Sequence, residues 1–474
     1  MDSQRTKPNA RRLLIQGARG SIPNLVFRAV VQAHWRKMRM KFNKSGQLLL
    51  VSAASLLIAG LLTACGTNTV DFVYVTSAQA AGSSNYGEVN VFEVNVQSGF
   101  MRQIPTSPFP SGGRNPVADA VSTDNQNLYV VNQDDNSIVQ FAIGSDGKLY
   151  PQNTVNTPGI FPSAVSVSGS NLFVLDTYQP LNTCSNATPC SGSVAVFPVL
   201  PAATTSGSTT LSGTLGSALQ NGNLNYWPLS LPGNSSDILK PTGISVLPTG
   251  DYLNVAVYDT TANTGYVFGF WIDPATSGAS VPATVTCPPV PTGLTALPAG
   301  TLCPLNSPPV AAGVKPSAIT SDPSGAHVYI TDAVAGTVLG YSVQSGALVP
   351  LTGGTNGGNS FPAGGQPSAV IVDQSGSFLY VTNFLDANVT AYSISSGVLT
   401  RGTSYATGLQ PVAICIDPSQ NHYLYTINYL GSSLSGFEVS SADGSLINTQ
   451  SSPYRSNALP TAMAAIPHNS TAKK

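Results

Sequence analysis

Residues Ser375–Gly397 read SGSFLYVTNFLDANVTAYSISSG, and their alternation decides the fold. Aromatic or branched residues alternate with small polar ones in two runs, which are separated by Asn383–Asn388. A period of two places alternate side chains on opposite faces of a β-strand, and Asn and Asp favour turns. The segment therefore predicts a β-hairpin.

This hairpin motif is repeated along the chain. Related segments begin at Phe72, Leu128, Asn171, Tyr252, His327 and Leu424, so the motif occurs seven times. A second motif has a proline, a small residue two places later and then an apolar run. It begins at Pro116, Pro162, Pro241, Pro316, Pro367, Pro411 and Pro460, at spacings of 46, 79, 75, 51, 44 and 49 residues. Four spacings lie near one period, and the two long ones contain cysteine loops, which indicates insertions into the same repeat.

A repeat of roughly 40–50 residues that contains several strands is typical of a β-propeller. We therefore predict an all-β fold with seven four-stranded antiparallel blades. The first hairpin motif has no proline motif before it, and the last proline motif, at Pro460, has no hairpin after it. We expect the C-terminal strand to join the N-terminal blade and close the ring.

Composition supports this fold and limits the partners. Only 9% of the 474 residues are charged, and the chain has 45 Gly and 36 Pro, which suits strands joined by many turns. Residues 1–64 carry a net charge of +10, whereas residues 65–474 carry −11. Because this second part has no basic surface for a phosphate backbone, we do not expect a nucleic acid partner.

The N-terminal segment is typical of an export signal. Cationic residues at 36–44 precede the apolar run Leu48–Leu62, which is too short for a bilayer span of about 20 residues. Leu62–Cys65 reads LTAC and resembles the bacterial lipobox, which implies lipidation of Cys65 and an extracytoplasmic, membrane-anchored protein. The alternatives are an ordinary cleaved signal or an uncleaved anchor. The predicted divisions are 1–64 (extension and signal), 65–70 (tether), 71–467 (propeller) and 468–474 (tail).

The cysteines suit an oxidising compartment. Cys184 and Cys190 lie in one polar loop, and Cys287 and Cys303 flank a proline-rich loop of 15 residues. We predict that each pair forms a disulfide that closes its loop. Cys415 lies in an apolar run and is expected to be a buried free thiol. Since no His or CxxC motif accompanies these residues, a zinc site is not expected.

The motif LYVTN…N…V…Y, together with PxAI and DPSG, resembles the YVTN-repeat, lactonase-like seven-bladed propellers, over about residues 70–467. Members that are similar to 6-phosphogluconolactonase or to muconate-lactonising enzymes are enzymes, and many others are exported binding proteins. The resemblance thus implies the fold and two functions, because a fold alone does not choose between them.

The repeats also locate a candidate site. The residues just before the prolines should surround one mouth of the channel, and they form a polar, partly cationic ring. The predicted ligand-binding residues are Arg114, Asn115, Lys240, Lys315, Gln366 and Gln410, with Asp176 and Asp332 from the ends of the neighbouring strands. Such a ring could hold an anionic or polyhydroxy ligand. The alternatives are that the lysines only solvate loops and that the strand-end Asp and Asn residues stabilise turns.

We therefore predict an exported, monomeric binding module for a small polar or anionic ligand or for another protein, with no cofactor or metal. The alternative is a lactone hydrolase or lactonising isomerase that acts at the mouth. His327 and His422 fall beside turns at the far ends of the blades, and no G-x-S-x-G or HExxH motif is present. The insertions Thr183–Gly192, Thr204–Asn223 and Pro274–Val314 are expected to cover the mouth.

Overall fold

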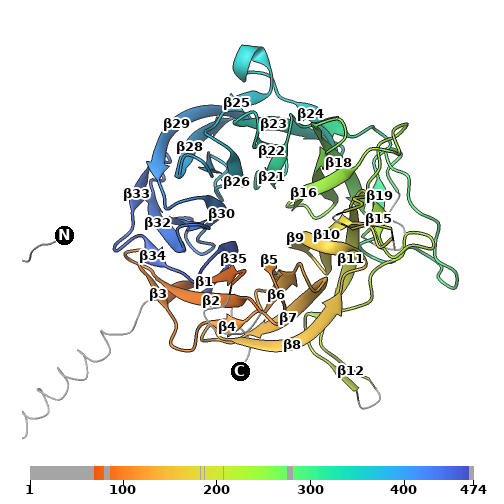
Figure 1. Cartoon of the computed structure of the whole chain (residues 1–474), viewed down its shortest axis with the longest axis horizontal. Coiled ribbons are helices and arrows are strands. Elements are labelled where there is room, and N and C mark those ends of the chain that lie inside the picture. The colour runs from red at the N-terminus through yellow and green to blue at the C-terminus, as the bar shows by residue number, and fades with distance from the viewer. Residues whose placement is uncertain are drawn as a thin grey trace, which may run out of the picture. The chain divides into compact units, whose positions relative to one another are not determined.

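The structure, a computed structural model, describes residues 69–79, 86–181, 183–185, 187–205, 208–274 and 281–468. Seven antiparallel sheets form a ring around a central axis (Figure 1). This arrangement confirms the predicted seven-bladed propeller. The predicted signal, the predicted lipidation site at Cys65 and the tail beyond His468 lie outside the described residues.

Each blade contains four strands from the axis outward. The innermost strands are β5 (Pro116–Val121), β9 (Ile160–Ser168), β16 (Leu239–Val246), β21 (Pro316–Ser321), β26 (Pro367–Val372), β30 (Pro411–Ile416) and β35 (Pro460–Pro467). The second strands are β1 (Thr69–Ser77), β6 (Asn127–Asn132), β10 (Asn171–Tyr178), β17 (Tyr252–Asp259), β22 (His327–Asp332), β27 (Phe378–Asn383) and β31 (Tyr423–Asn428). We letter the blades A to G in the order of these second strands.

The outer half of each blade is less regular. The third strands are β2 (Glu88–Asn95), β7 (Ser137–Ile143), β11 (Ser193–Leu200), β18 (Thr264–Ile272), β23 (Thr337–Gln344), β28 (Asn388–Ser395) and β32 (Ser433–Val439). The outermost strand is continuous in blade B as β8 (Leu149–Asn156) and in blade F as β29 (Val398–Ala406). In the other blades it is split into β3 (Met101–Gln103) and β4 (Phe109–Pro110), β14 (Thr214–Leu215) and β15 (Trp227–Pro228), β19 (Leu302–Pro304) and β20 (Val310–Ala311), β24 (Ala347–Pro350) and β25 (Ser360–Pro362), and β33 (Leu446–Asn448) and β34 (Tyr454–Arg455). A hairpin, β12 (Ala203–Thr205) with β13 (Ser208–Thr210), and a single 3-10 turn, η1 (Thr355–Gly357), lie outside the blades.

The ring closes as predicted. Strand β35 pairs with β1 in an antiparallel ladder that places Met463 opposite Val75 and Ala465 opposite Val73. Blade A therefore takes its innermost strand from the C-terminal end of the propeller (Figure 1).

Because every innermost strand runs the same way, the two faces of the ring differ. The mouth face carries the starts of the innermost strands and the connections between the second and third strands. The turn face carries the connections between the first and second strands and between the third and fourth strands.

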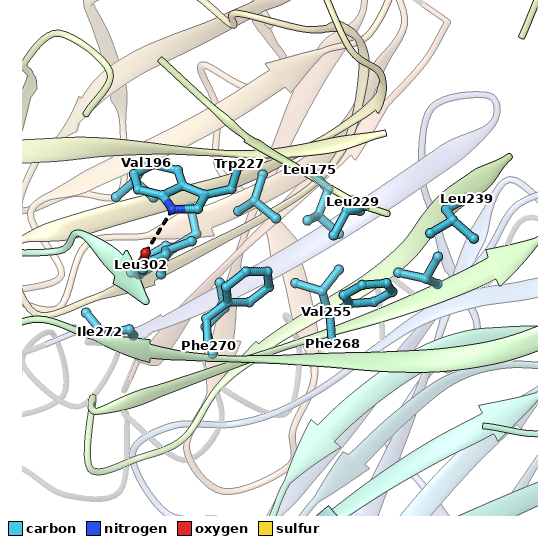
Figure 2. Packing of buried hydrophobic residues seen from close by; sticks show 14 of the residues in the cluster. Leu175, Val196, Trp227, Leu229, Leu239, Val255, Phe268, Phe270, Ile272 and Leu302 are labelled. Atoms are coloured by element: carbon cyan, nitrogen blue, oxygen red, sulfur yellow. Dashed lines mark hydrogen bonds between the residues drawn. The ribbon is translucent and has the colours of Figure 1, made fainter. Parts of the chain in front are cut away.

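The core consists of separate apolar clusters between adjacent blades, one for each of the seven junctions. Figure 2 shows the cluster between blades C and D, where Trp227 packs among Leu, Val and Phe side chains and its Nε1 donates a 2.8 Å hydrogen bond to the carbonyl of Leu302. Burial of each blade thus depends on both neighbours, so a single hairpin could not be stable alone.

The tyrosine of the LYVTN motif links adjacent blades. In five blades its hydroxyl donates to the carbonyl of a glycine in the outer turn of the next blade, and we call this bond the tyrosine latch. The pairs are Tyr74–Gly147 (3.3 Å), Tyr129–Gly213 (2.7 Å), Tyr329–Gly397 (3.0 Å), Tyr380–Gly444 (3.0 Å) and Tyr425–Gly99 (2.8 Å). Each of these glycines has a positive φ, a conformation that glycine adopts at little cost.

Two junctions lack the latch. The corresponding residue is Phe173 in blade C and Asn254 in blade D, so the C–D and D–E junctions are held differently. Asn254 is fully buried, and neither atom of its side-chain amide has a hydrogen-bond partner among the residues that the structure describes.

Both predicted disulfides are present. The Cα atoms are 5.5 Å apart in Cys184–Cys190 and 4.3 Å apart in Cys287–Cys303. Cys415 is a free, buried thiol, as predicted. Burial, with smaller contributions from the nearby carboxylates of Asp71 and Asp417, raises the pKa of this thiol well above its ordinary value.

Candidate functional site

A cavity of about 250 Å³ lies on the propeller axis, below the mouth. We number the residues of each innermost strand from its motif proline. Residues at positions two to four line the cavity in every blade except blade F, and most of them are small. Because small side chains make up most of this wall, space remains for a ligand.

Hydroxyl groups surround the upper part of this cavity. The second residue of every innermost strand lies at a β-bulge, and in five of the seven blades it is Ser or Thr. Ser317, Ser368 and Thr461 donate hydrogen bonds of 2.6, 2.6 and 2.8 Å to the carbonyl of the proline that starts the next innermost strand. These hydroxyls join the blades at the axis, and their oxygens can still accept hydrogen bonds from a ligand.

Asp119 is a carboxylate in the wall of the axial cavity. It is the fourth residue of its innermost strand, a position that is Val, Ile or Met in the other six blades. Thr76 donates a 2.6 Å hydrogen bond to its Oδ2, whereas its Oδ1 is buried and has no partner. Burial raises the pKa of Asp119 to about 7, although the bond from Thr76 opposes this shift. An Asp of this kind can accept or donate a proton near neutral pH.

Three residues of the predicted mouth ring share a backbone role. Asn115, Gln366 and Gln410 have left-handed φ values of 50°, 54° and 56°, and each precedes the proline of an innermost strand. Their carbonyl oxygens accept N–H bonds from the residues that follow the second strands. The repeat thus positions them at equivalent places around the mouth, as the sequence indicated.

Lys240 and Lys315 occupy a distinct part of the mouth. Strands β10 and β17 continue two residues further toward the mouth than β22 does, measured from the proline of each innermost strand, and these extensions carry Tyr178 and Tyr258. The Lys240 Nζ lies 5.7 Å from the centroid of the Tyr178 ring, and the Lys315 Nζ lies 5.5 Å from that of the Tyr258 ring. Within the described residues, neither ammonium forms an ion pair with a carboxylate. Two cations on adjacent blades are therefore available to an anion.

Arg114 differs because its charge is already paired. Its guanidinium forms a 2.6 Å salt bridge with Asp135, and its backbone N–H donates to the same carboxylate at 2.7 Å. Asn115 donates to the side chains of Gln133 and Asp134 at 3.2 and 3.1 Å. Both side chains thus stabilise the adjacent loop, and their predicted contact with a ligand stays a prediction.

Asp176 and Asp332 are buried beneath the mouth rather than exposed in it. Asp332 accepts N–H bonds from Val314 (2.6 Å), Lys315 (3.1 Å), Val334 (3.0 Å) and Ala335 (3.0 Å), which is the turn chemistry that the sequence suggested as an alternative. Asp176 accepts a 3.0 Å bond from the Gly159 N–H, and burial raises its pKa to about 7. No contact in the described residues supports ligand binding by either carboxylate, and that role also stays a prediction.

Only one of the three insertions lies wholly at the mouth. The Cys184–Cys190 loop joins β10 to β11 on the mouth face. The other two leave the ends of third strands, after Leu200 and after Ile272, on the turn face, and only the end of the third insertion, Val310–Val314, returns to the mouth face. The expectation that all three insertions cover the mouth was therefore wrong, because the direction of the third strand fixes where its connection emerges.

Other reactive groups lie away from the mouth. His327 Nδ1 lies 2.8 Å from Asp322 in the turn of its own blade, and His422 lies 3.2 Å from Glu438. In the part of the chain that the structure describes, no three His, Cys, Asp or Glu side chains converge as metal ligands. The same described residues contain no helix with the length and apolar character of a membrane span.

Comparisons with known proteins agree on the architecture. The family model for lactonase, 7-bladed beta-propeller, matches residues 83–185 and 296–460, which make up more than half of the chain. Three solved structures are similar: a candidate 6-phosphogluconolactonase from Bacteroides uniformis (17% identity, 84% of this chain and 100% of that chain, TM-score 0.60), another from Bacteroides fragilis (18%, 85% and 99%, 0.58) and the periplasmic gluconolactonase of Pseudomonas aeruginosa (19%, 84% and 99%, 0.59). At these identities the likeness shows the fold alone. No curated protein sequence matches the chain.

Proposed function

The chain belongs to the lactonase family of seven-bladed β-propellers, and we propose that it binds a small anionic ligand at the mouth between blades C, D and E. The observation that carries this proposal is the pair Lys240 and Lys315, each of which lies over a tyrosine ring and lacks a carboxylate partner among the described residues. A cation that stacks on an aromatic ring keeps its N–H groups available for charge-assisted hydrogen bonds.

The surrounding charge favours a site of this kind. Residues 65–474 carry a net charge of −11, so two unpaired ammonium groups on adjacent blades form a local exception. Below them, the hydroxyl oxygens of Ser317 and Thr461 line a cavity of about 250 Å³. A ligand that combines a negative charge with several hydroxyl groups would use both features.

The test is calorimetric titration of the full chain with gluconate and with 6-phosphogluconate. We expect the double substitution Lys240→Ala and Lys315→Ala to weaken binding at least tenfold. Lys148→Ala is the matched control, because Lys148 lies on the turn face and is already paired with Asp146 at 2.5 Å. Equal binding by the double variant, or no binding of either compound by the unchanged protein, would contradict the proposal.

A second candidate is lactone hydrolysis, and Asp119 is the observation that favours it. As a general base, its carboxylate would accept a proton from a water molecule while the water oxygen bonds to the lactone carbonyl carbon. The ring C–O bond then breaks, and the leaving alkoxide takes up the proton that Asp119 accepted. Lys240 and Lys315 would stabilise the negative charge that develops on the carbonyl oxygen.

Hydrolysis makes a separate pH prediction. Only the deprotonated carboxylate is a base, so kcat/KM for glucono-1,5-lactone should rise with pH and level off above about 7. Asp119→Asn should lower kcat/KM at least 100-fold and remove this rise. Asp71→Asn is the control, because burial also raises the pKa of Asp71 to about 7 but its Oδ1 accepts from Ser419, outside the axial cavity. An unchanged rate in Asp119→Asn would exclude this mechanism and leave the binding proposal intact.

The location of the protein is part of the proposal. Two disulfides in the structure, the apolar segment before Cys65 and the periplasmic gluconolactonase among the similar structures support an extracytoplasmic protein that is lipidated at Cys65. Mass spectrometry of the mature N-terminus tests this directly. Diacylglyceryl-cysteine is expected in the unchanged protein and should be absent from Cys65→Ser, whereas cleavage at another residue would contradict lipidation.

A further inference from the structure

Loops of the same design connect the second and third strands of five blades. In blades B, D, E, F and G, the last residue of the second strand and the first of the third strand are five positions apart. The fifth residue of each six-residue segment has a positive φ: Asn136, Asn263, Gly336, Ala387 and Ser432. Since the backbone follows the same path each time, the third residues occupy equivalent places on the mouth face.

Three adjacent blades place apolar residues at this equivalent position. The third residue is Asp134 in blade B and Thr261 in blade D, but it is Val334, Leu385 and Leu430 in blades E, F and G. These three side chains are 63%, 67% and 57% exposed. Leu409, which lies beside Leu430 on the same face, is 57% exposed. We call these four residues the apolar arc.

The arc is held by hydrogen bonds within the loops. The Val334 N–H donates to Asp332 Oδ1 at 3.0 Å, the Leu385 N–H to the Gly365 carbonyl at 3.1 Å, and the Gly431 N–H to the Leu409 carbonyl at 3.1 Å. The loops therefore present the apolar side chains in a fixed geometry, which lowers the entropy lost when a partner binds.

Cations flank both ends of the arc. Lys315 lies in blade E, and Arg455 lies in blade G opposite Ser433, where the third strand begins at the mouth face. Both are exposed, and neither has a carboxylate partner among the described residues. One exposed carboxylate, Asp386, lies beside Leu385, and it accepts a 2.7 Å bond from the Gly365 N–H.

From this arrangement we infer that the apolar arc is a docking surface for an acidic, leucine-containing segment of another protein. Exposed apolar patches mark interaction surfaces, and the arc repeats an exposed apolar side chain on three adjacent blades of one face. The flanking cations select a negatively charged partner. This surface is separate from the small-ligand site proposed between blades C, D and E, although Lys315 borders both.

Charge argues against two other occupants. An anionic membrane is not the expected occupant, because recruitment to such lipids generally needs a cluster of several basic residues, and only Lys315 and Arg455 flank the arc. A second copy of the chain docked arc to arc would bring Lys315 and Arg455 close to their own counterparts, and like charges at an interface oppose association.

The experiment measures peptide binding to the full chain by fluorescence anisotropy. Three synthetic 12-residue peptides serve as probes: one alternates Leu and Glu, one alternates Leu and Lys, and one alternates Ser and Glu. We expect the Leu–Glu peptide to bind at least tenfold more tightly than the other two. The double substitution Leu385→Ser and Leu430→Ser should weaken this binding at least tenfold, and Lys315→Ala with Arg455→Ala should weaken it several-fold.

Ile447→Ser provides the matched control, because Ile447 is 68% exposed but lies on β33 at the end of the blade near the turn face. Its binding of the Leu–Glu peptide should be unchanged. The inference fails if the three peptides bind equally, or if Ile447→Ser has the same effect as the arc variant. It also fails if the protein binds phosphatidylglycerol vesicles and the variant with Leu385→Ser and Leu430→Ser loses that binding. A dimer that sedimentation detects in the unchanged protein but not in this variant would contradict the inference in the same way. Lys240→Ala should leave peptide binding unchanged. Because Lys240 belongs only to the proposed small-ligand site, failure of the docking proposal can be distinguished from failure of the small-ligand proposal.

Discussion

The five regular junctions of the ring and the two that flank blade D achieve the same packing by different means. At the regular junctions a tyrosine latch joins each blade to the next. At the C–D junction the latch position is Phe173, and a large apolar cluster that includes Trp227 holds the two blades together. At the D–E junction it is Asn254, whose amide is buried without a partner.

The difference shows that the ring needs a filled interface at every junction rather than an identical one. The long insertions and both disulfides belong to blades C and D, beside the junctions that have lost the latch. We infer that the disulfides and the additional apolar contacts of blades C and D stabilise these two junctions in place of the missing tyrosine hydrogen bonds.

The largest expected effect comes from removing the device that is peculiar to the C–D junction. Trp227→Ala should lower the free energy of unfolding by about 3–5 kcal/mol, because it opens a cavity in the cluster and leaves the Leu302 carbonyl without its donor. Urea denaturation followed by circular dichroism measures this loss. Tyr150→Ala, at a residue that is 49% exposed on an outermost strand, should cost less than 1 kcal/mol. Similar losses in the two variants would mean that Trp227 does not hold this junction.

The disulfide of blade D comes next. Replacing Cys287 and Cys303 by Ala should destabilise the protein by about 3 kcal/mol, because the unfolded chain regains the entropy that closure of this loop removes. The Cys184–Cys190 disulfide closes a shorter loop, so the same replacement there should cost about 2 kcal/mol. Calorimetric melting of both variants gives the ranking, and the reverse order would contradict the loop-length argument.

Loss of one tyrosine latch tests a regular junction. Tyr380→Phe keeps the ring but removes the hydroxyl that donates to the Gly444 carbonyl, which then stays buried without this bond. The expected cost is about 1–2 kcal/mol in the free energy of unfolding. Tyr258→Phe, which alters an exposed hydroxyl at the mouth, is the control and should be nearly neutral. A loss below 0.5 kcal/mol, on the order of ordinary surface substitutions, would make the latch incidental.

The smallest expected effect comes from introducing a tyrosine latch at the D–E junction. This change also tests the comparison most directly. A cavity of about 10 Å³ lies beside Asn254 and Gly346, the glycine that corresponds to the latch acceptors of other blades. Asn254→Tyr should place a hydroxyl near the Gly346 carbonyl and raise stability by about 1 kcal/mol. Asn254→Ala, which enlarges the cavity, should lower it. A structure of the Tyr variant in which the hydroxyl points elsewhere would show that blade D cannot accept the regular junction.

Most of the fold could be predicted from the sequence, because two motifs repeat seven times and their order specifies strand sequence and closure. The position of the mouth residues followed from the same repeat. Asp119 could also have been found, since PVADAV is the copy of the second motif with a carboxylate at its fourth position. The predicted site residues instead lie beside the prolines or at the ends of the second strands, and Asp119 belongs to neither set.

Other features depend on packing that the repeat does not encode. The stacking of Lys240 and Lys315 on tyrosine rings requires the two-residue extensions of β10 and β17, which arise from strand register. The burial of Asp332 follows from the loop that folds over it, and the exposure of Leu385 follows from the conformation of its own loop. Neither property can be determined from residue type alone.

Pairing between β35 and β1 also constrains how the molecule can be made. A polypeptide is synthesised from its N-terminus, so β1 is available almost four hundred residues before the partner that covers its axial side. During that interval the hydrogen-bonding groups along that side of β1 can pair with any other extended chain. Folding of the ring can therefore become fully cooperative only after the ribosome has released Pro460–Pro467. Until then β1 is not protected from aggregation by its native partner.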